Sequence, residues 1–276
     1  MKRVTTFLAI LTLFLISAPG KAQVTVSPTT LFIDGKSQFE TFIVMNGTDV
    51  AQEVSLEYQF GYPDADSLGN IFINYEDRQM EEKYSIADWI RGFPRNFIIE
   101  PGQRRVVRLT VRPQKQLPEG MYWARIKTRS TPVSPEIGMQ QQSGITTQIT
   151  VQFEQVTPVF YKVGNPITGI NIRDVRVVNE NGATVVSADV ERLGNAPYLG
   201  TVTMNILDEN GNQVGEVMNL VSVYFDRKLR LALDTGDLPA GRYQSNIRFE
   251  SHRNDIGDHQ LVQSEPVNQT LNFTIH

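Results

Sequence analysis

Two histidines and two aspartates lie close together near the C-terminus, and by residue type they are the best candidates for chemistry in this chain. His252, Asp255, Asp258 and His259 could bind a metal ion through imidazole and carboxylate groups. The segment 251–259 that carries them also has the Asn, Asp and Gly content of a hairpin loop. Because this composition favours a solvated loop, we expect no metal site.

A second acidic segment begins like a calcium-binding loop. Asp64 and Asp66 precede Gly69, which stands at the sixth position of such a loop. The pattern then fails, because Leu68 occupies a ligand position and Tyr75 stands where a bidentate glutamate is needed. We therefore expect a β-hairpin turn here.

The residue inventory excludes several function classes. The chain has 276 residues with no cysteine and three histidines, the last of which is the final residue, His276. Disulfides, zinc–thiolate sites and a cysteine nucleophile are therefore excluded, and a general base is scarce. The formal net charge of −4 argues against a nucleic-acid partner. We expect no enzyme, no cofactor and no small-molecule substrate.

The N-terminus has the pattern of a cleaved signal peptide. Lys2 and Arg3 precede an apolar run over 4–17, and the small residues Gly20 and Ala22 follow. A membrane anchor is the alternative, but the run is shorter than the roughly 20 residues that a spanning helix needs. Residues 1–22 are thus predicted to be a signal peptide of an exported protein.

The rest of the chain has the rhythm of strands separated by turns. Alternation is clearest at Val107, Leu109 and Val111, where one face of the expected strand is apolar. The pattern changes at 164–166 (Gly-Asn-Pro), after which a new series of strands begins. The sequence therefore predicts an all-β protein with two immunoglobulin-like β-sandwich domains in tandem, at 23–164 and 165–276.

Two segments depart from this rhythm. The connection between 61 and 95 is long, and Ser85 to Ile90 is its only expected helical turn, with Ser85 as the N-cap. The segment from Ser130 to Ser143 contains two prolines and three consecutive glutamines, which favours a mobile loop.

A long alternating strand is expected from Ile145 to Tyr161. Typical strands have about 5–6 residues, so this one is unusual. Its apolar side chains could fill the core of their own domain, which periodicity alone favours. Alternatively, the strand could lend its edge and side chains to another chain by β-augmentation.

Several motifs in the first predicted domain carry a family resemblance through their order and spacing. They are Val26-Ser27-Pro28, Val44-Met45-Asn46-Gly47-Thr48, Ile99-Glu100-Pro101-Gly102-Gln103, Val107-Arg108-Leu109, Leu117-Pro118-Glu119-Gly120 and Val159-Phe160-Tyr161-Lys162. With these motifs the chain resembles the periplasmic chaperones of pilus assembly, the PapD-like family. The resemblance implies a periplasmic, ATP-independent chaperone that caps incomplete, pilin-like β-sandwich subunits, with an outer-membrane usher as a possible further partner.

In that family the last strand of the first domain donates alternating side chains to the client subunit. The resemblance places the donor residues at Ile145, Thr147, Ile149, Val151 and Phe153. It also implies an interdomain charge network of Arg108, Glu119 and Lys162, with an acidic partner from the second domain.

One departure from the family favours an alternative. Where family members hold the client's terminal carboxylate with an arginine and a lysine, this chain has Thr29 or Thr30 and Pro158. The segment 61–95 is also enlarged and is expected to carry a contact surface of its own. The alternative function is a non-enzymatic adaptor or structural subunit of an envelope complex.

Overall fold

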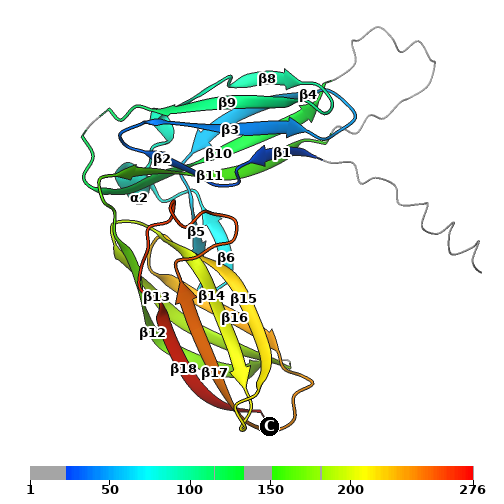
Figure 1. The fold of residues 1–276 in the computed structure, drawn as a ribbon, viewed down its shortest axis with the longest axis vertical. Coiled ribbons are helices and arrows are strands. Elements are labelled where there is room, and N and C mark those ends of the chain that lie inside the picture. Colours follow the sequence, from blue (N-terminus) through cyan, green and yellow to red (C-terminus); the bar gives the residue numbers. More distant parts are fainter. Residues whose placement is uncertain (1–22, 115, 134–150, 181, 276) are drawn as a thin grey trace, which may run out of the picture.

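The chain folds into two all-β lobes that meet at an angle (Figure 1). The computed structural model describes residues 23–114, 116–133, 151–180 and 182–275, so the predicted signal peptide lies outside it. The sheets of the first lobe come from residues 24–163 and those of the second from residues 168–275. The predicted all-β fold with two immunoglobulin-like sandwiches is confirmed. No helix in the described ranges is long and apolar enough to span a membrane.

The first lobe consists of two packed sheets. The sheet that we call the outer sheet has the strand order β1 (Val24–Ser27), β3 (Phe39–Asn46), β9 (Arg104–Val111) and β7 (Ile90–Phe93). The inner sheet, which faces the second lobe, has the order β2 (Leu31–Asp34), β11 (Phe153–Val163), β10 (Gly120–Pro132), β4 (Gln52–Gln59) and β8 (Asn96–Ile99).

Alternation along the strands builds the core between these two sheets. Val107, Leu109 and Val111 of β9 are fully buried, as their spacing predicts, and they pack against Ala124 and Ile126 of β10 in the same cluster. Burial of each large apolar side chain stabilises the lobe by about 1.5–3 kcal/mol before entropy costs. Side chains between these positions point to the outer surface.

The second lobe is also a two-sheet sandwich. One sheet has the order β12 (Thr168–Glu180), β13 (Ala183–Gly194) and β16 (Arg227–Asp234). The other has the order β15 (Gln213–Val223), β14 (Tyr198–Leu207), β17 (Gly241–Glu250) and β18 (Val267–Ile275). The tight turn between β14 and β15 depends on Gly211, whose φ is 83°.

An aromatic cluster joins the two lobes. Trp123 on β10 is almost fully buried, and the centroid of its ring lies 4.9 Å from that of Tyr224 in the second lobe. Other buried members come from both lobes, namely Phe32, Phe60, Tyr62, Met121, Phe160, Ala196, Leu199, Ile256 and Leu261. Because this cluster is apolar and continuous, the lobes are packed together and not merely tethered.

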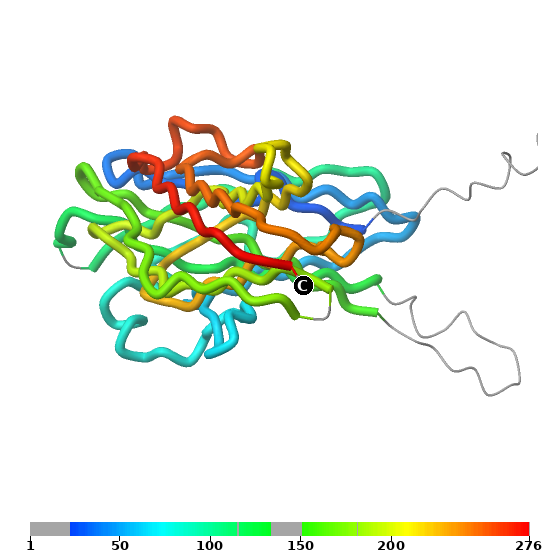
Figure 2. Tube along the Cα trace, turned by 90° about the horizontal axis from the view of Figure 1, so that it is seen from below, coloured from blue at the N-terminus to red at the C-terminus, as the bar shows by residue number. Residues whose placement is uncertain are grey.

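The connection between β4 and β7 contains a hairpin and a short helix. The hairpin of β5 (Tyr62–Ala65) and β6 (Ile71–Asn74) confirms the turn that the sequence predicts at 64–69. Figure 1 shows this hairpin between the two lobes, and Figure 2 shows it away from the described ends of β10 and β11.

A helical turn lies where the sequence predicts one, as the 3-10 turn η1 (Ala87–Trp89), but Ser85 is not its N-cap. The helix before it, α2 (Arg78–Tyr84), was not predicted. It begins after Asp77, whose carboxylate accepts a hydrogen bond from the Met80 N–H at 3.1 Å, and it ends at Ser85. Only Met80 and Tyr84 of α2 pack against the aromatic cluster, so the apolar pattern is too short to be recognised in the sequence.

Candidate functional site

Strand β11 has an unpaired edge over half of its length. It pairs with β10 along its whole course, from Phe153 opposite Ser130 to Val163 opposite Gly120. On its other side β2 pairs in parallel only with Val159 to Lys162. Within the described part of the chain, the backbone of residues 153–158 therefore has no neighbouring strand on that side. Such an edge is a template for pairing with another strand.

A groove lies beside this edge, between the two sheets of the first lobe. It has a volume of about 370 Å³ and is lined by residues of β1, β10 and β11, including Val24, Val26 and Phe153. The Val26 N–H donates to the side-chain oxygen of Gln155 at 3.2 Å, so a side chain connects β1 to β11 where no backbone pairing does. The sandwich is thus open at this end, next to the unpaired edge.

The predicted donor residues fall on this edge or precede it. Ile145, Thr147 and Ile149 lie outside the described residues. Val151 is 50% exposed and precedes β11, while Phe153, the first residue of β11, is 37% exposed and lines the groove. The expected strand from Ile145 to Tyr161 is described only from Phe153, and it continues to Val163.

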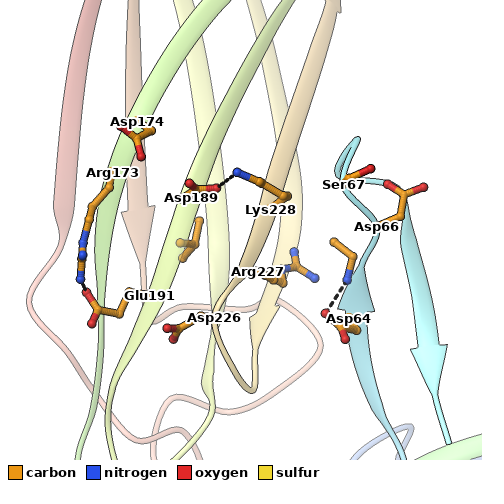
Figure 3. A pocket seen from close by; sticks show the side chains of 12 residues that line it. Asp64, Asp66, Ser67, Arg173, Asp174, Asp189, Glu191, Asp226, Arg227 and Lys228 are labelled. Atoms are coloured by element: carbon orange, nitrogen blue, oxygen red, sulfur yellow. Dashed lines mark hydrogen bonds and ion pairs between the residues drawn. The ribbon is translucent and has the colours of Figure 1, made fainter. Parts of the chain in front are cut away.

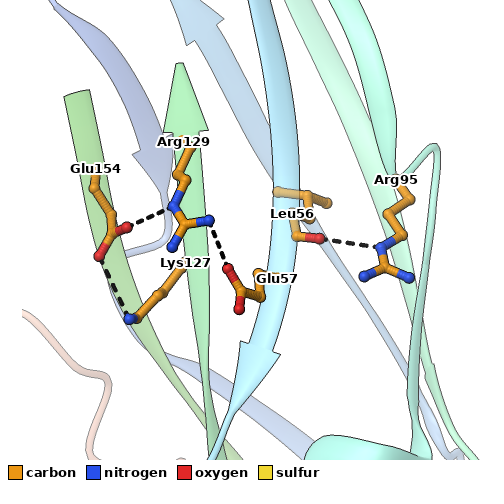
Figure 4. Close-up of polar contacts among 6 residues, drawn as sticks. All are labelled: Leu56, Glu57, Arg95, Lys127, Arg129 and Glu154. Atoms are coloured by element: carbon orange, nitrogen blue, oxygen red, sulfur yellow. Dashed lines mark hydrogen bonds and ion pairs between the residues drawn. The ribbon is translucent and has the colours of Figure 1, made fainter. Parts of the chain in front are cut away.

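Charged side chains connect the three strands beside this edge on the surface of the inner sheet (Figure 4). Arg129 of β10 contacts Glu57 of β4 at 2.7 Å and Glu154 of β11 at 2.8 Å. Lys127 lies 3.8 Å from the same Glu154. The hydrogen bond to Glu154 and the charge of Glu57 raise the pKa of Arg129. These pairs are partly exposed, so they hold the strands in register more than they stabilise the fold.

The predicted interdomain charge network is not assembled from its three members. Arg108 is exposed on the outer sheet, and within the described chain no ion pair joins it to Glu119 or Lys162. Lys162 does reach the second lobe, but its ammonium donates to the backbone oxygen of Gln260 instead of to an acid. Burial lowers the pKa of Lys162, although Asp34 opposes this effect.

A polar side chain that the sequence did not single out links the lobes instead. The Asn195 amide donates to the backbone oxygen of Glu119 at 3.0 Å, and its oxygen accepts from the Ile167 N–H at 2.8 Å. The backbone of Asn195 also accepts from the Met121 N–H at 3.1 Å. Asn195 therefore holds the connection between the lobes at three backbone groups.

The positions of the family's carboxylate anchors carry no charge, but a buried arginine is their neighbour. Thr30 is buried, and Pro158 of β11 lies opposite Arg125 of β10. The Arg125 guanidinium donates to the backbone oxygen of Gly61 at 3.0 Å and is itself buried. Burial raises the pKa of the nearby Tyr224 to about 12, against the influence of Arg125. Arg125 is thus part of the packing between the lobes.

The enlarged segment 61–95 contacts the second lobe of the same chain. The Tyr62 ring packs edge-on against Phe225, with ring centroids 4.7 Å apart, and its hydroxyl donates to Asp77 at 2.7 Å. At the hairpin tip, a Cβ added to Gly69 would lie 2.7 Å from the Cβ of Arg230. The hairpin therefore braces the two lobes against each other.

A charged cavity of about 590 Å³ lies between this hairpin and strands β12, β13 and β16 (Figure 3). Lys228 pairs with Asp189 and Arg173 pairs with Glu191 along its wall. Arg227 is buried, and its Nε has no hydrogen-bond partner among the described residues. Burial lowers the pKa of Arg227, with Asp64 acting in the opposite direction. Among the described residues that line this cavity, no nucleophile is paired with a base.

The C-terminal histidine segment is a surface loop. His252 contacts the Asp258 carboxylate at 2.9 Å and the Asn254 side-chain oxygen at 3.2 Å. The Asp258 contact raises the pKa of this exposed imidazole. No group of three or more His, Asp or Glu side chains in the described ranges is arranged to hold a metal ion.

In structure, the chain is similar to chaperones of pilus subunits. A chain of the Salmonella enterica SafA pilin–SafB chaperone complex matches with a TM-score of 0.46 at 12% identity, covering 92% of this chain and 99% of that one. A chain of the CsuC–CsuE chaperone–tip adhesion subunit complex of Acinetobacter baumannii matches with a TM-score of 0.45 at 12% identity, covering 90% of this chain and 98% of that one. The E. coli chaperone DraB matches with a TM-score of 0.42 at 14% identity, covering 92% of this chain and 98% of that one. No family model and no curated protein matches the sequence.

Sequence reasoning missed the residues that join the lobes. Asn195 bonds to Glu119 and Tyr62 packs against Phe225 across the lobes, while Arg125 bonds to Gly61 beside this contact; each of these pairs is more than 60 positions apart in the chain. No local pattern signals such contacts, although buried aromatic residues next to a predicted domain boundary are a general indication of an interface.

Proposed function

We propose that the protein is an exported, non-enzymatic chaperone of the periplasm that binds incomplete, pilin-like β-sandwich subunits by strand donation. The unpaired edge of β11 at 153–158, beside an open groove, is the observation that carries this proposal. The motifs that resemble the PapD-like family support it independently.

The energetics need neither ATP nor a cofactor. A client that lacks one strand exposes unpaired backbone groups and an apolar groove, and a donated strand covers both. Val151 and Phe153 are exposed at the start of the edge, where a bound client would bury them. Each such side chain contributes about 1.5–3 kcal/mol on burial, before ordering costs.

Charge substitutions at the edge test this function. Val151→Asp and Phe153→Asp should reduce recovery of strand-deficient subunits at least about tenfold, because a carboxylate would be buried unpaired in the client. Val178→Asp is the matched control, since Val178 is 44% exposed but lies on β12 in the second lobe. The measurement is the yield of client subunits that co-purify with each variant, quantified by mass spectrometry. Undiminished recovery with Val151→Asp and Phe153→Asp would refute strand donation at this edge.

The exposed apolar residues of the β5–β6 hairpin favour a second candidate, an envelope adaptor or structural subunit. Leu68, Ile71 and Phe72 are exposed at or beside the hairpin tip, away from the β11 edge. An adaptor would cross-link in cells to one stoichiometric partner through Ile71, whereas a chaperone would cross-link to a set of subunits through Val151. The distribution of partners between these two positions separates the candidates.

A further inference from the structure

The exposed face of the outer sheet combines apolar side chains with arginines and contains no acid. The strand register places Ile43 beside Val106, and Arg108 between Thr41 and Phe93. Phe93 is 78% exposed and Val106 is 52% exposed. The outward-facing positions together are Thr25, Ser27, Phe39, Thr41, Ile43, Met45, Arg91, Phe93, Arg104, Val106, Arg108 and Thr110. We call these residues the outer face.

Two arginines of the outer face have no partner. Neither Arg104 nor Arg108 takes part in a side-chain hydrogen bond or an ion pair within the described chain. Four exposed arginines on other sheets, Arg129, Arg173, Arg230 and Arg248, contact carboxylates (Figure 4 for Arg129), although the exposed Arg176 on β12 does not. Arg104 and Arg108 lie on the same face of β9 with Val106 between them, so an anionic partner could pair with both guanidinium groups while it covers the apolar side chain.

We propose that the outer face binds a second protein, through a surface that presents carboxylates around an apolar patch. Arg104 and Arg108 would pair with the carboxylates, and Ile43, Val106 and Phe93 would cover the apolar patch. Arginine and aromatic residues are the types enriched at protein interfaces. The site is separate from the edge of β11, so it does not depend on strand donation.

Charge and size distinguish this partner from other occupants. A second copy of the chain would bring arginines against arginines, because a symmetric interface uses the same patch twice. An anionic bilayer is an extended plane and would also meet the acidic remainder of a chain with net charge −4. A local acidic patch on a protein meets only the outer face.

The area of the outer face indicates a transient contact. Strands about 4.8 Å apart and outward rows about 6.8 Å apart give four strands and four rows a footprint on the order of 300 Å². A standard stable interface covers about 800 Å² on each partner. Binding should therefore be weak, fast and sensitive to salt.

A defined peptide tests the proposal on the full chain. The probe is a fluorescent peptide of alternating Glu and Val with one Phe, followed by fluorescence anisotropy. It should bind, its affinity should fall several-fold between about 0.05 and 0.3 M salt, and a peptide with Lys in place of Glu should not bind. Arg104→Glu with Arg108→Glu should weaken binding at least about tenfold, and Val106→Asp should weaken it as well.

Control variants separate the outer face from the rest of the chain. Arg242→Glu makes the same charge reversal at one position of the second lobe, at a side chain 87% exposed, and should leave binding unchanged, whereas the matched single variant Arg108→Glu should weaken it. Val151→Asp should also bind the peptide normally, whether or not it binds clients. If the double Glu variant does not fold, Arg104→Gln with Arg108→Gln should still weaken binding.

Three results would overturn the proposal. The first is peptide binding that survives both the Glu and the Gln substitutions. The second is binding to phosphatidylglycerol vesicles, dependent on Arg108, without binding to the peptide, which would assign the face to a membrane. The third is a dimer in sedimentation equilibrium that Arg108→Glu dissociates, which would assign it to a second copy.

Discussion

At the scale of single residues, Asn195 explains how the lobes are joined without a charge network. Its amide and backbone satisfy groups of Glu119, Met121 and Ile167, which lie on both sides of the connection. Lys162 adds one bond to the Gln260 backbone. Hydrogen bonds to backbone groups fix an angle without the desolvation cost of a buried ion pair.

Asn195→Ala should lower the free energy of unfolding by about 1–2 kcal/mol, because two side-chain hydrogen bonds are lost at partly exposed sites. Urea denaturation measures the change. Asn254→Ala is the control, since Asn254 contacts only the exposed His252 and should change stability by less than about 0.5 kcal/mol. Equal effects of the two substitutions would contradict the linking role of Asn195.

At the scale of elements, the hairpin of β5 and β6 in the enlarged connection 61–95 contacts the second lobe and supports the packing of the two lobes. Its Tyr62 ring enters the aromatic cluster, and its tip approaches Arg230 on β16. The enlarged segment 61–95 is expected from the sequence to carry a contact surface, and one face of it contacts the chain's own second lobe.

Two glycines with the same backbone conformation test this brace. Gly69 and Gly211 both have φ of 83°, but an added Cβ at Gly69 would meet Arg230 at 2.7 Å, whereas Gly211 has nothing within 4 Å. Both substitutions to Ala cost about 1–2 kcal/mol of strain. Gly69→Ala should cost a further 1–3 kcal/mol, roughly, because the hairpin must move away from β16. Thermal unfolding and limited proteolysis of the hairpin measure the difference, and indistinguishable variants would contradict docking of the tip.

The sequence predicted most elements, but it did not predict how they pack. Val107, Leu109 and Val111 alternate with exposed residues, so their strand and its buried face follow from period two. The Asp and Gly residues at 64–69 predicted a turn because these residue types favour turn conformations by themselves, without distant contacts. The helix at Arg78 depends on a single cap, Asp77, and was not predicted, whereas the helical turn expected in 85–90 is present at Ala87–Trp89. The Arg125–Gly61 and Asn195–Glu119 contacts join distant positions that local patterns do not relate.

At the scale of the whole molecule, the chain is a pair of packed sandwiches whose candidate binding features are a strand edge and sheet faces. The described residues form no metal-binding group. In the charged cavity beside the β5–β6 hairpin, the acidic side chains of Asp189 and Glu191 form ion pairs with Lys228 and Arg173. The β11 edge, the outer face and the hairpin tip lie at separate places on this body. A body of this kind is suited to holding other proteins, and the proposals assign a client to the first surface and an acidic protein to the second.

Hydrogen–deuterium exchange at the backbone amides of residues 153–157 tests strand donation most directly, since Pro158 carries no N–H. In the free protein, the amides that point away from β10 should exchange fast, because no strand covers that side. Adding a pilin-like subunit that lacks its last strand should protect these amides at least about tenfold, since each would donate to the client's backbone. If the subunit binds while these amides stay unprotected, and protection appears only on the outer face or the hairpin, the chaperone mechanism proposed for this chain is contradicted.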